Sequence, residues 1–248
     1  MYKLCTLLSL LYTSVSTAQQ LAPIQLDRPD QTECPFTVPK KYIQAEIGLA
    51  YENAGRHISS ILIPTTLLKY GLTDRLEIRL ITELEQIKEF SEKNTGINPV
   101  KVGFKTKLIE EKGLIPMISF LGHLELAPVA SKHNKTDFYA PSFRFTLQHT
   151  LSSKFSLGYN LGAEWDGFSP EPIFLYTLTT GYSISEKLGS FIELYGFLPQ
   201  KDISDHYIDS GLTYLLNNNM MLDISGGASI DNHSHSYFLS MGYSFRFK

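Results

Sequence analysis

The sequence lacks the features that mark helical membrane proteins, disulfide-stabilised domains and nucleic-acid-binding proteins. Beyond residue 18, no stretch approaches the roughly 20 consecutive apolar residues that a membrane-spanning helix needs. The only cysteines are Cys5 and Cys34, so loss of a leader containing Cys5 would leave no pair for an intramolecular disulfide. The net charge of −3, from 22 basic and 25 acidic residues, provides no basic surface of the kind that binds nucleic acid.

The first eighteen residues have the pattern of a secretory signal peptide. Lys3 supplies a positive charge, Leu7–Tyr12 is a short apolar core, and Ser16-Thr17-Ala18 fits a small-residue cleavage site, with the mature chain starting at Gln19. An N-terminal anchor helix is the alternative, but the apolar run is too short to span a bilayer. We therefore expect a signal peptide at 1–18, a proline-rich segment at 19–40 and a β domain at 41–248.

Most of residues 41–248 alternates between apolar and polar residues with a period of two, which is the period of a β-strand. The clearest stretch runs from Phe143 to Trp165, where two alternating runs flank the short polar connection Ser152-Ser153-Lys154. These strands are about ten residues long, whereas globular strands average five or six. Their connections alternate between short and long, and aromatic residues lie at both ends of the apolar faces. The pattern predicts an all-β fold, a transmembrane antiparallel up-and-down β-barrel of about twelve strands with both termini periplasmic.

Two stretches fit this pattern less well. Ile61–Ile63 is a continuous apolar run inside an expected strand. Gln86–Asn98 is mostly polar, and its charged residues Glu89, Glu92 and Lys93 are compatible with a longer loop or with one or two helical turns.

Charged residues fall on the strand faces opposite the apolar ones. In a barrel they would line the lumen, because Arg or Lys facing lipid at the midplane costs about 2–4 kcal/mol. They could form a selective pore, or a structural ladder in which acidic Glu77–Glu85 neutralises basic Lys101–Lys107 on the next strand; the ladder is favoured, with selectivity as a by-product. The expected lumen-lining residues are Glu46, Glu77, Arg79, Glu83, Lys101, Lys105, Lys107, Arg144, Glu164, Glu193, Asp209, Asp223 and Arg246.

The segment 19–40 carries four prolines and shows no periodicity, which excludes it from the barrel wall. Its charged residues Asp27, Arg28, Asp30 and Glu33 would meet lumen charges if the segment entered the barrel as a plug. We expect their partners to include Lys105, Lys107 and Arg246. The alternative is a flexible periplasmic tail.

Catalytic and metal-binding patterns are weak. Asp231–His235 contains two histidines but lacks the further ligands of a closed metal site, so we interpret it as a solvated loop. No serine stands in a recognisable nucleophile motif that a histidine such as His123, His149 or His206 could activate. We therefore predict no catalytic, metal or cofactor-binding residues, and no cofactor. A barrel enzyme of the lipid-hydrolase type and a structural or adhesive barrel remain the alternatives to a channel.

Several motifs resemble a known family. Asp27–Glu33 with Pro35–Lys40, Leu68–Arg79, Asp209–Tyr214 and Leu222-Asp223 are similar to stretches of the "MetA-pathway of phenol degradation" outer-membrane proteins. The resemblance implies a transporter barrel in the outer membrane of a Gram-negative bacterium, passing small molecules whose identity the name does not fix. It also implies contact with outer-membrane lipid and with the barrel-assembly machinery through the C-terminal strand. Members usually end on an aromatic residue, whereas Phe247 is followed here by Lys248.

Overall fold

The computed structural model describes residues 21–55 and 57–248, so the expected signal peptide and its cleavage site lie outside the described residues. Within these two ranges no helix is long and apolar enough to cross a membrane. The strands are β1 (Ile43–Gly55), β2 (Ile58–Thr73), β3 (Leu76–Glu89), β4 (Glu92–Ile97), β5 (Val100–Ile109), β6 (Met117–Leu126), β7 (Ala140–Thr150), β8 (Phe155–Glu164), β9 (Ile173–Ser183), β10 (Leu188–Pro199), β11 (Asp205–Asn217), β12 (Met220–Ser229) and β13 (Tyr237–Phe247).

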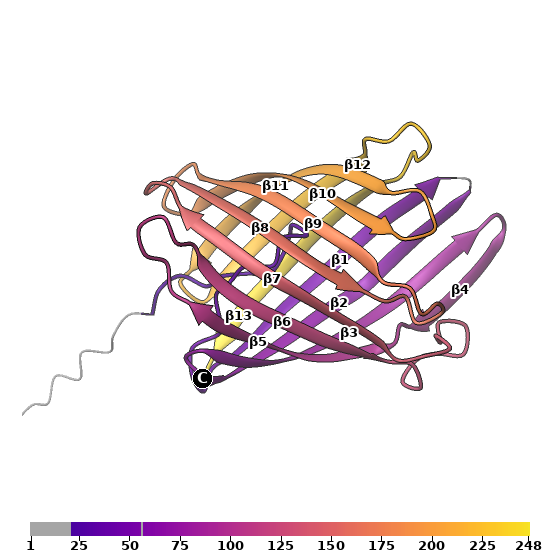
Figure 1. The fold of residues 1–248 in the computed structure, drawn as a ribbon, viewed down its shortest axis with the longest axis horizontal. Helices are drawn as coiled ribbons and strands as arrows, with labels where there is room; N and C mark the ends of the chain where they lie inside the picture. Colours follow the sequence, from indigo (N-terminus) through magenta and orange to yellow (C-terminus); the bar gives the residue numbers. More distant parts are fainter. Residues whose placement is uncertain (1–20, 56) are drawn as a thin grey trace, which may run out of the picture.

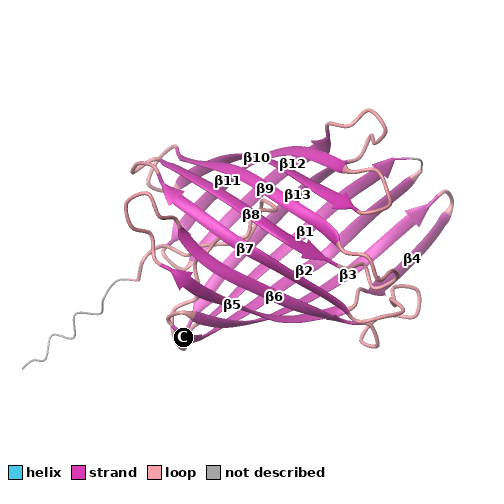
Figure 2. Cartoon of the chain, in the orientation of Figure 1, coloured by secondary structure: helices cyan, strands magenta, loops and turns pink. Residues whose placement is uncertain are grey.

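Twelve of the thirteen described strands form a closed antiparallel ring (Figures 1 and 2). Each strand pairs with its sequence neighbours, except that β3 pairs with β5, and β1 closes the ring by pairing with β13. Strand β4 pairs only with β3 and stands outside the ring. The sequence-based prediction of an up-and-down barrel of about twelve strands is confirmed, because the ring strands other than β2 alternate regularly between apolar and polar residues.

The polar stretch Gln86–Asn98 is neither a loop nor helical. Strand β3 continues to Glu89, the chain turns at Phe90 and Ser91, and β4 returns along β3 as a hairpin. Most of the β4 side chains are exposed, so the hairpin has no buried face. A strand that is solvated on both faces needs no alternation, and the period of two is therefore absent from its sequence.

The apolar run Ile61–Ile63 coincides with an irregularity in β2. The register between β2 and β3 shifts between Leu62 and Thr65. Leu62 is buried towards the lumen, whereas Ile63 and Pro64 are exposed on the outside. A bulge places an extra residue in one strand and changes the face of the residues that follow. It also accommodates a proline, which has no N–H for the ladder.

The distribution of side chains is inverted relative to a soluble protein. The fully buried side chains are mostly polar and include Arg79, Lys69 and Lys105, while large apolar side chains cover the outer face. Neighbouring residues show the contrast, since Leu161 is 58% exposed and Asn160 is 0% exposed. An apolar outer surface around a polar interior is the arrangement of a barrel that sits in lipid.

The two ends of the barrel differ in their connections. At one end, on the left in Figure 1, lie tight turns such as Asp74-Arg75 between β2 and β3, and Asn218-Asn219 between β11 and β12. The C-terminus lies at this end (Figure 1). At the other end the connections include the segments 127–139 and 165–172. We call these the short-turn end and the long-loop end.

The face assignment predicts opposite outcomes for two arginine substitutions. Leu161→Arg should prevent stable assembly, because it places a charge against hydrocarbon at a cost of about 2–4 kcal/mol. Gln148→Arg is the matched control, since Gln148 lines a cavity at the short-turn end of the lumen. Folding yield is measured by the heat-modifiable migration of the refolded barrel on a gel. Equal yields for the two variants would contradict the assignment of faces.

Candidate functional site

The proline-rich segment, described from Leu21 to Lys40, lies inside the barrel. It enters at the short-turn end, where the Ile24 N–H donates to the Asn218 carbonyl at 2.9 Å. It leaves at the same end, where the Lys40 N–H donates to the Asp74 carboxylate at 3.2 Å. Between these points the chain reaches into the lumen and returns (Figure 1). We call residues 21–40 the N-terminal segment.

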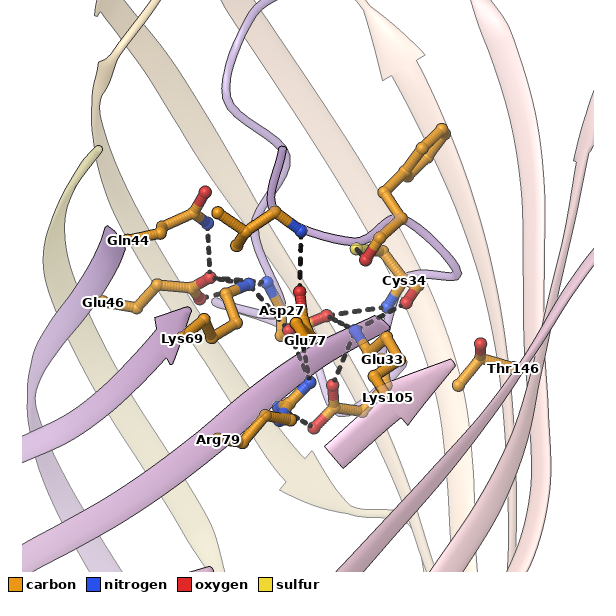
Figure 3. A network of polar contacts seen from close by, with 12 residues as sticks. Asp27, Glu33, Cys34, Gln44, Glu46, Lys69, Glu77, Arg79, Lys105 and Thr146 are labelled. Atoms are coloured by element: carbon orange, nitrogen blue, oxygen red, sulfur yellow. Dashed lines mark hydrogen bonds and ion pairs between the residues drawn. The ribbon is translucent and has the colours of Figure 1, made fainter. Parts of the chain in front are cut away.

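Asp27 lies at the centre of a buried network (Figure 3). Its carboxylate accepts from Lys105 Nζ at 2.6 Å, Lys69 Nζ at 2.8 Å and Arg79 Nη1 at 2.9 Å. Burial alone would favour the neutral acid. The three cations outweigh burial, so the pKa of Asp27 lies well below its ordinary value and the side chain stays ionised. Asp27 thus joins cations from β2, β3 and β5.

Three more carboxylates complete the network. Glu46 of β1 pairs with Lys69 and accepts from the main-chain N–H groups of Asp27, at 3.0 Å, and Arg28, at 3.1 Å. Glu77 accepts from the Val38 N–H at 2.7 Å and from Arg79 at 3.3 Å. Glu33 pairs with Arg79 at 3.0 Å. The cations of the wall are therefore balanced jointly by acids of the wall and acids of the N-terminal segment.

This pairing corrects the ladder interpretation. Glu77 and Lys105 do face each other in the register of β3 and β5. However, Lys105 Nζ bonds to Asp27 and to the Cys34 carbonyl, at 2.8 Å, and not to Glu77. At this level the wall is neutralised only in part by its own Glu46 and Glu77, and the segment contributes the remaining charges.

Arg28 fixes the segment to β12 and β13, which follow β1 around the ring. Its Nη2 donates to Asp223 at 3.1 Å and to the Ser240 hydroxyl at 2.8 Å. Gly48 and Gly242 provide the room, since a Cβ at Gly48 would lie 2.2 Å from Arg28 Nη1 and one at Gly242 would lie 2.6 Å from Nε. Glycine at both positions permits a close approach that any side chain would block.

Strands β7, β8 and β10 hold the tip of the segment. Glu193 accepts from the Gln31 N–H at 2.7 Å and from the Thr32 hydroxyl. The Asn160 amide binds both main-chain groups of Glu33, at 2.7 Å and 3.0 Å. Arg144 donates to the Gln31 carbonyl at 2.9 Å and pairs with Glu164 at 3.5 Å.

Two carboxylates near the tip have no cationic partner among the described residues. Asp209 stands opposite Glu193 in the register of β10 and β11, and both of its carboxylate oxygens are buried without a hydrogen bond. Asp30 lies close to both. Burial and the neighbouring Glu193 raise the pKa of Asp30 well above its ordinary value. This part of the lumen therefore holds a group of acidic side chains that must bind protons unless a cation joins them.

The remaining expected residues lie in the lumen wall with other partners. Lys101 pairs with Glu125 at 3.4 Å, and Lys107 pairs with Glu110 at 3.4 Å. The expectation that Lys107 would meet an acid of the segment is therefore wrong. Arg246 does meet the segment, but it donates to the Ala22 carbonyl at 2.8 Å and not to an acid. Lys69 was not predicted as a lumen residue, because the bulge in β2 obscured which residues face inward.

The segment divides the lumen into two cavities. One, of about 620 Å³, lies towards the long-loop end and is lined by residues such as Glu52, Glu83 and Tyr207. The other, of about 390 Å³, lies towards the short-turn end and is lined by residues such as Gln148 and Lys187. Arg28, Pro29 and Asp30 line both. We call them the long-loop cavity and the short-turn cavity.

One cluster in the described chain has the side chains to hold a metal ion. The ligand atoms of Asp205, Asp231 and His233 lie within 4.8 Å of one another. The sequence pattern indicated His233 as a possible ligand but not Asp205, which is distant in sequence and belongs to β11. Asp231 already accepts from the His206 N–H, and His233 contacts Asp205 at 3.2 Å. We assign the cluster a structural role in joining the β12–β13 loop to β11.

Comparison with known proteins identifies similar sequences and folds. The family model described as "Putative MetA-pathway of phenol degradation" matches residues 26–247. A search of the curated proteins found no match. The fold is similar to that of the COG4313 outer membrane channel from Pseudomonas putida F1, with a TM-score of 0.71 and 13% identity over 90% of this chain and 100% of that one.

Two porins share the fold at lower similarity. For the NanC porin the TM-score is 0.58 at 10% identity, covering 81% of this chain and 98% of that one. For the KdgM porin in complex with disordered oligogalacturonate the TM-score is 0.55 at 11% identity, covering 82% and 99%. At these identities the likeness concerns the fold.

The Asp27 network predicts that Asp27→Asn releases the N-terminal segment. Removing one partner from a buried charge network costs about 3–5 kcal/mol. Cys34 reports release, because it lies on the segment and is the only cysteine of the chain after residue 18. A polymer-linked maleimide too large to enter the lumen should label Cys34 in the Asp27→Asn barrel and not in the unsubstituted barrel. Asp209→Asn, which removes an unpaired buried carboxylate, is the control and should stay unlabelled. Labelling of neither variant would show that Asp27 does not hold the segment.

Proposed function

Because the chain belongs to the MetA-pathway of phenol degradation family, we propose that it is an outer-membrane channel whose lumen is restricted by the N-terminal segment. The observation that carries this proposal is the pair of cavities on either side of the segment. Both are lined by polar and apolar residues inside a closed barrel with an apolar outer face. A small molecule passing along the lumen would meet the segment between them.

The segment acts in this proposal as a size and charge filter. It is bound by charged groups of β1, β2, β3, β5 and β10, which makes it a fixed part of the lumen at rest. A twelve-stranded barrel is narrower than the porins of 16–18 strands that leave an aqueous channel. Passage is therefore limited to small solutes, or it requires the segment to shift.

The location proposed is the bacterial outer membrane, with a leader removed after Ala18. Short periplasmic turns and longer extracellular loops are the rule for such barrels. This rule places the short-turn end, and with it the C-terminus and the N-terminal segment, on the periplasmic side. Strand β13 would be the element that the barrel-assembly machinery contacts, with Phe247 as its last aromatic residue.

The family description links these proteins to phenol degradation. A molecule of the size of phenol would fit in the long-loop cavity. By contrast, the KdgM porin was observed with an oligogalacturonate, which is an anion. The long-loop cavity of this chain has several carboxylates in its lining. An acidic lining disfavours an anionic solute by like-charge repulsion.

A lipid hydrolase is the less favoured alternative. His149 hydrogen-bonds the Tyr159 hydroxyl at 3.3 Å, and His206 hydrogen-bonds the Tyr176 hydroxyl at 2.9 Å. A hydrolase of this type would need a serine beside its histidine.

The channel is tested by deleting residues 19–35. The deletion removes Asp27, Arg28, Asp30 and Glu33 and leaves the Thr37–Lys40 attachment to Asp74 in place. The lumen charges would be solvated by water, so the barrel should fold and its single-channel conductance in planar bilayers should rise severalfold. Leu114→Ser, at a fully exposed turn between β5 and β6, is the control and should leave the conductance unchanged. A folded deletion variant with unchanged conductance would show that the segment does not restrict the lumen.

The proposed orientation predicts which connections are accessible on intact cells. In a Cys34→Ala background, an impermeant thiol reagent should label Lys132→Cys and Ser169→Cys from outside. Ser153→Cys, at the tight turn between β7 and β8, should react only after the outer membrane is opened. Labelling of Ser153→Cys alone on intact cells would invert the orientation.

A further inference from the structure

The long-loop cavity has one wall rich in carboxylates. Glu52 of β1 and Glu83 and Glu85 of β3 line it, and they lie within electrostatic range of one another. Glu85 accepts a hydrogen bond from Asn98 at 3.0 Å. Glu52 and Glu83 make no ion pair with any residue in the described part of the chain. We call these three residues the carboxylate wall.

The basic residues around this cavity already have partners. Arg28, the one basic residue in its lining, pairs with Asp223. Glu46, also in the lining, is paired with Lys69. Lys101 pairs with Glu125 at 3.4 Å and also lies within electrostatic range of Glu83. The three carboxylates of the wall therefore share one nearby cation, which is already paired with Glu125.

Aromatic side chains form another part of the cavity lining. Tyr195 and Tyr207 stack with ring centroids 5.0 Å apart and an interplanar angle of 9°. Phe197 packs edge-on against Tyr195 at 6.0 Å. Phe238 of β13 lines the cavity beside the carboxylate wall, as the cross-strand neighbour of Glu52. We call these four residues the aromatic wall. Aromatic rings attract cations through their electron-rich faces and also bury apolar groups.

The floor of the cavity adds an independent sign of a missing positive charge. Asp30 lies there, next to the cross-strand pair of Glu193 and Asp209. Asp209 is 3% exposed, and neither of its oxygens has a partner. Buried carboxyl groups without a cation bind protons, and a positively charged group in this region would favour their ionised forms and be attracted by them.

We propose that the long-loop cavity binds small organic cations, with an ammonium group at the carboxylate wall and an apolar or aromatic body against the aromatic wall. The inference rests on the proposed channel and names the class of solute that it prefers. The volume of about 620 Å³ falls in the usual range for small-molecule sites. The carboxylate wall would repel an anion. A neutral aromatic molecule would contact only the aromatic wall, and an inorganic cation would contact only the carboxylate wall.

The proposal is tested with three probes of one shape: phenethylammonium, 2-phenylethanol and phenylacetate. Binding to the refolded full-length mature barrel in detergent is measured by titration calorimetry, which does not require conduction. Phenethylammonium should bind at least about tenfold more tightly than either other probe, because only it meets both walls. Equal binding of all three, or binding of phenethylammonium no tighter than that of sodium, would overturn the proposal.

Substitutions separate the two walls. Combined Glu52→Gln, Glu83→Gln and Glu85→Gln should remove the preference for phenethylammonium over 2-phenylethanol. Phe197→Leu with Phe238→Leu should weaken both probes. Glu89→Gln with Glu92→Gln, at the exposed tip of the β3–β4 hairpin, is the control and should change neither. Retained preference in the triple variant would overturn the proposal.

Conductance distinguishes this inference from the channel itself. A barrel that conducts but shows no preference for phenethylammonium leaves the channel standing and contradicts the inference. A barrel that binds phenethylammonium with the expected preference but never conducts supports the cation site and contradicts the channel.

Discussion

The placement of charge inside the barrel constrains the rest of the structure. Lys69, Arg79 and Lys105 are fully buried on neighbouring strands, and three cations so close together require counter-charges. The wall supplies Glu46 and Glu77, and the N-terminal segment supplies Asp27 and Glu33. Without the segment these cations would need water, which means an open lumen. The buried cations of β2, β3 and β5 therefore require either the acids of the segment or the water of a hydrated channel.

Most of the fold could be predicted because the lipid-facing side of each ring strand must be apolar, which imposes a visible period of two. The same reasoning explains where prediction failed. Strand β4 stands outside the ring, has no lipid-facing side, and its sequence shows no alternation. In β2 the bulge at Leu62–Thr65 changes the inward-facing set partway along, so Lys69 could not be assigned to the lumen from its spacing.

The candidate site could be predicted in kind but not in its pairing. Charge on the polar faces indicated a charged lumen, and prolines indicated a segment excluded from the wall. Which charges meet depends on the depth to which the segment enters. Asp27 reaches the level of Lys105, while Lys107, two residues nearer the short-turn end, pairs with Glu110. The sequence did not indicate a role for Gly48 and Gly242. Their role is to leave room for the side chain of Arg28, which is distant in sequence.

The lumen is electrostatically divided. On the side of β2, β3 and β5, the segment brings acids to bases and is firmly held. On the side of β10 and β11, Glu193 accepts hydrogen bonds from Gln31 and Thr32, but Asp30 lies beside Glu193 and Asp209 without a cation among the described residues. A cation bound there would balance these acidic groups and strengthen the hold of the tip. A positively charged solute would thus shift the position of the N-terminal segment, which limits the passage of that solute, because the binding energy of the solute depends on where the segment lies.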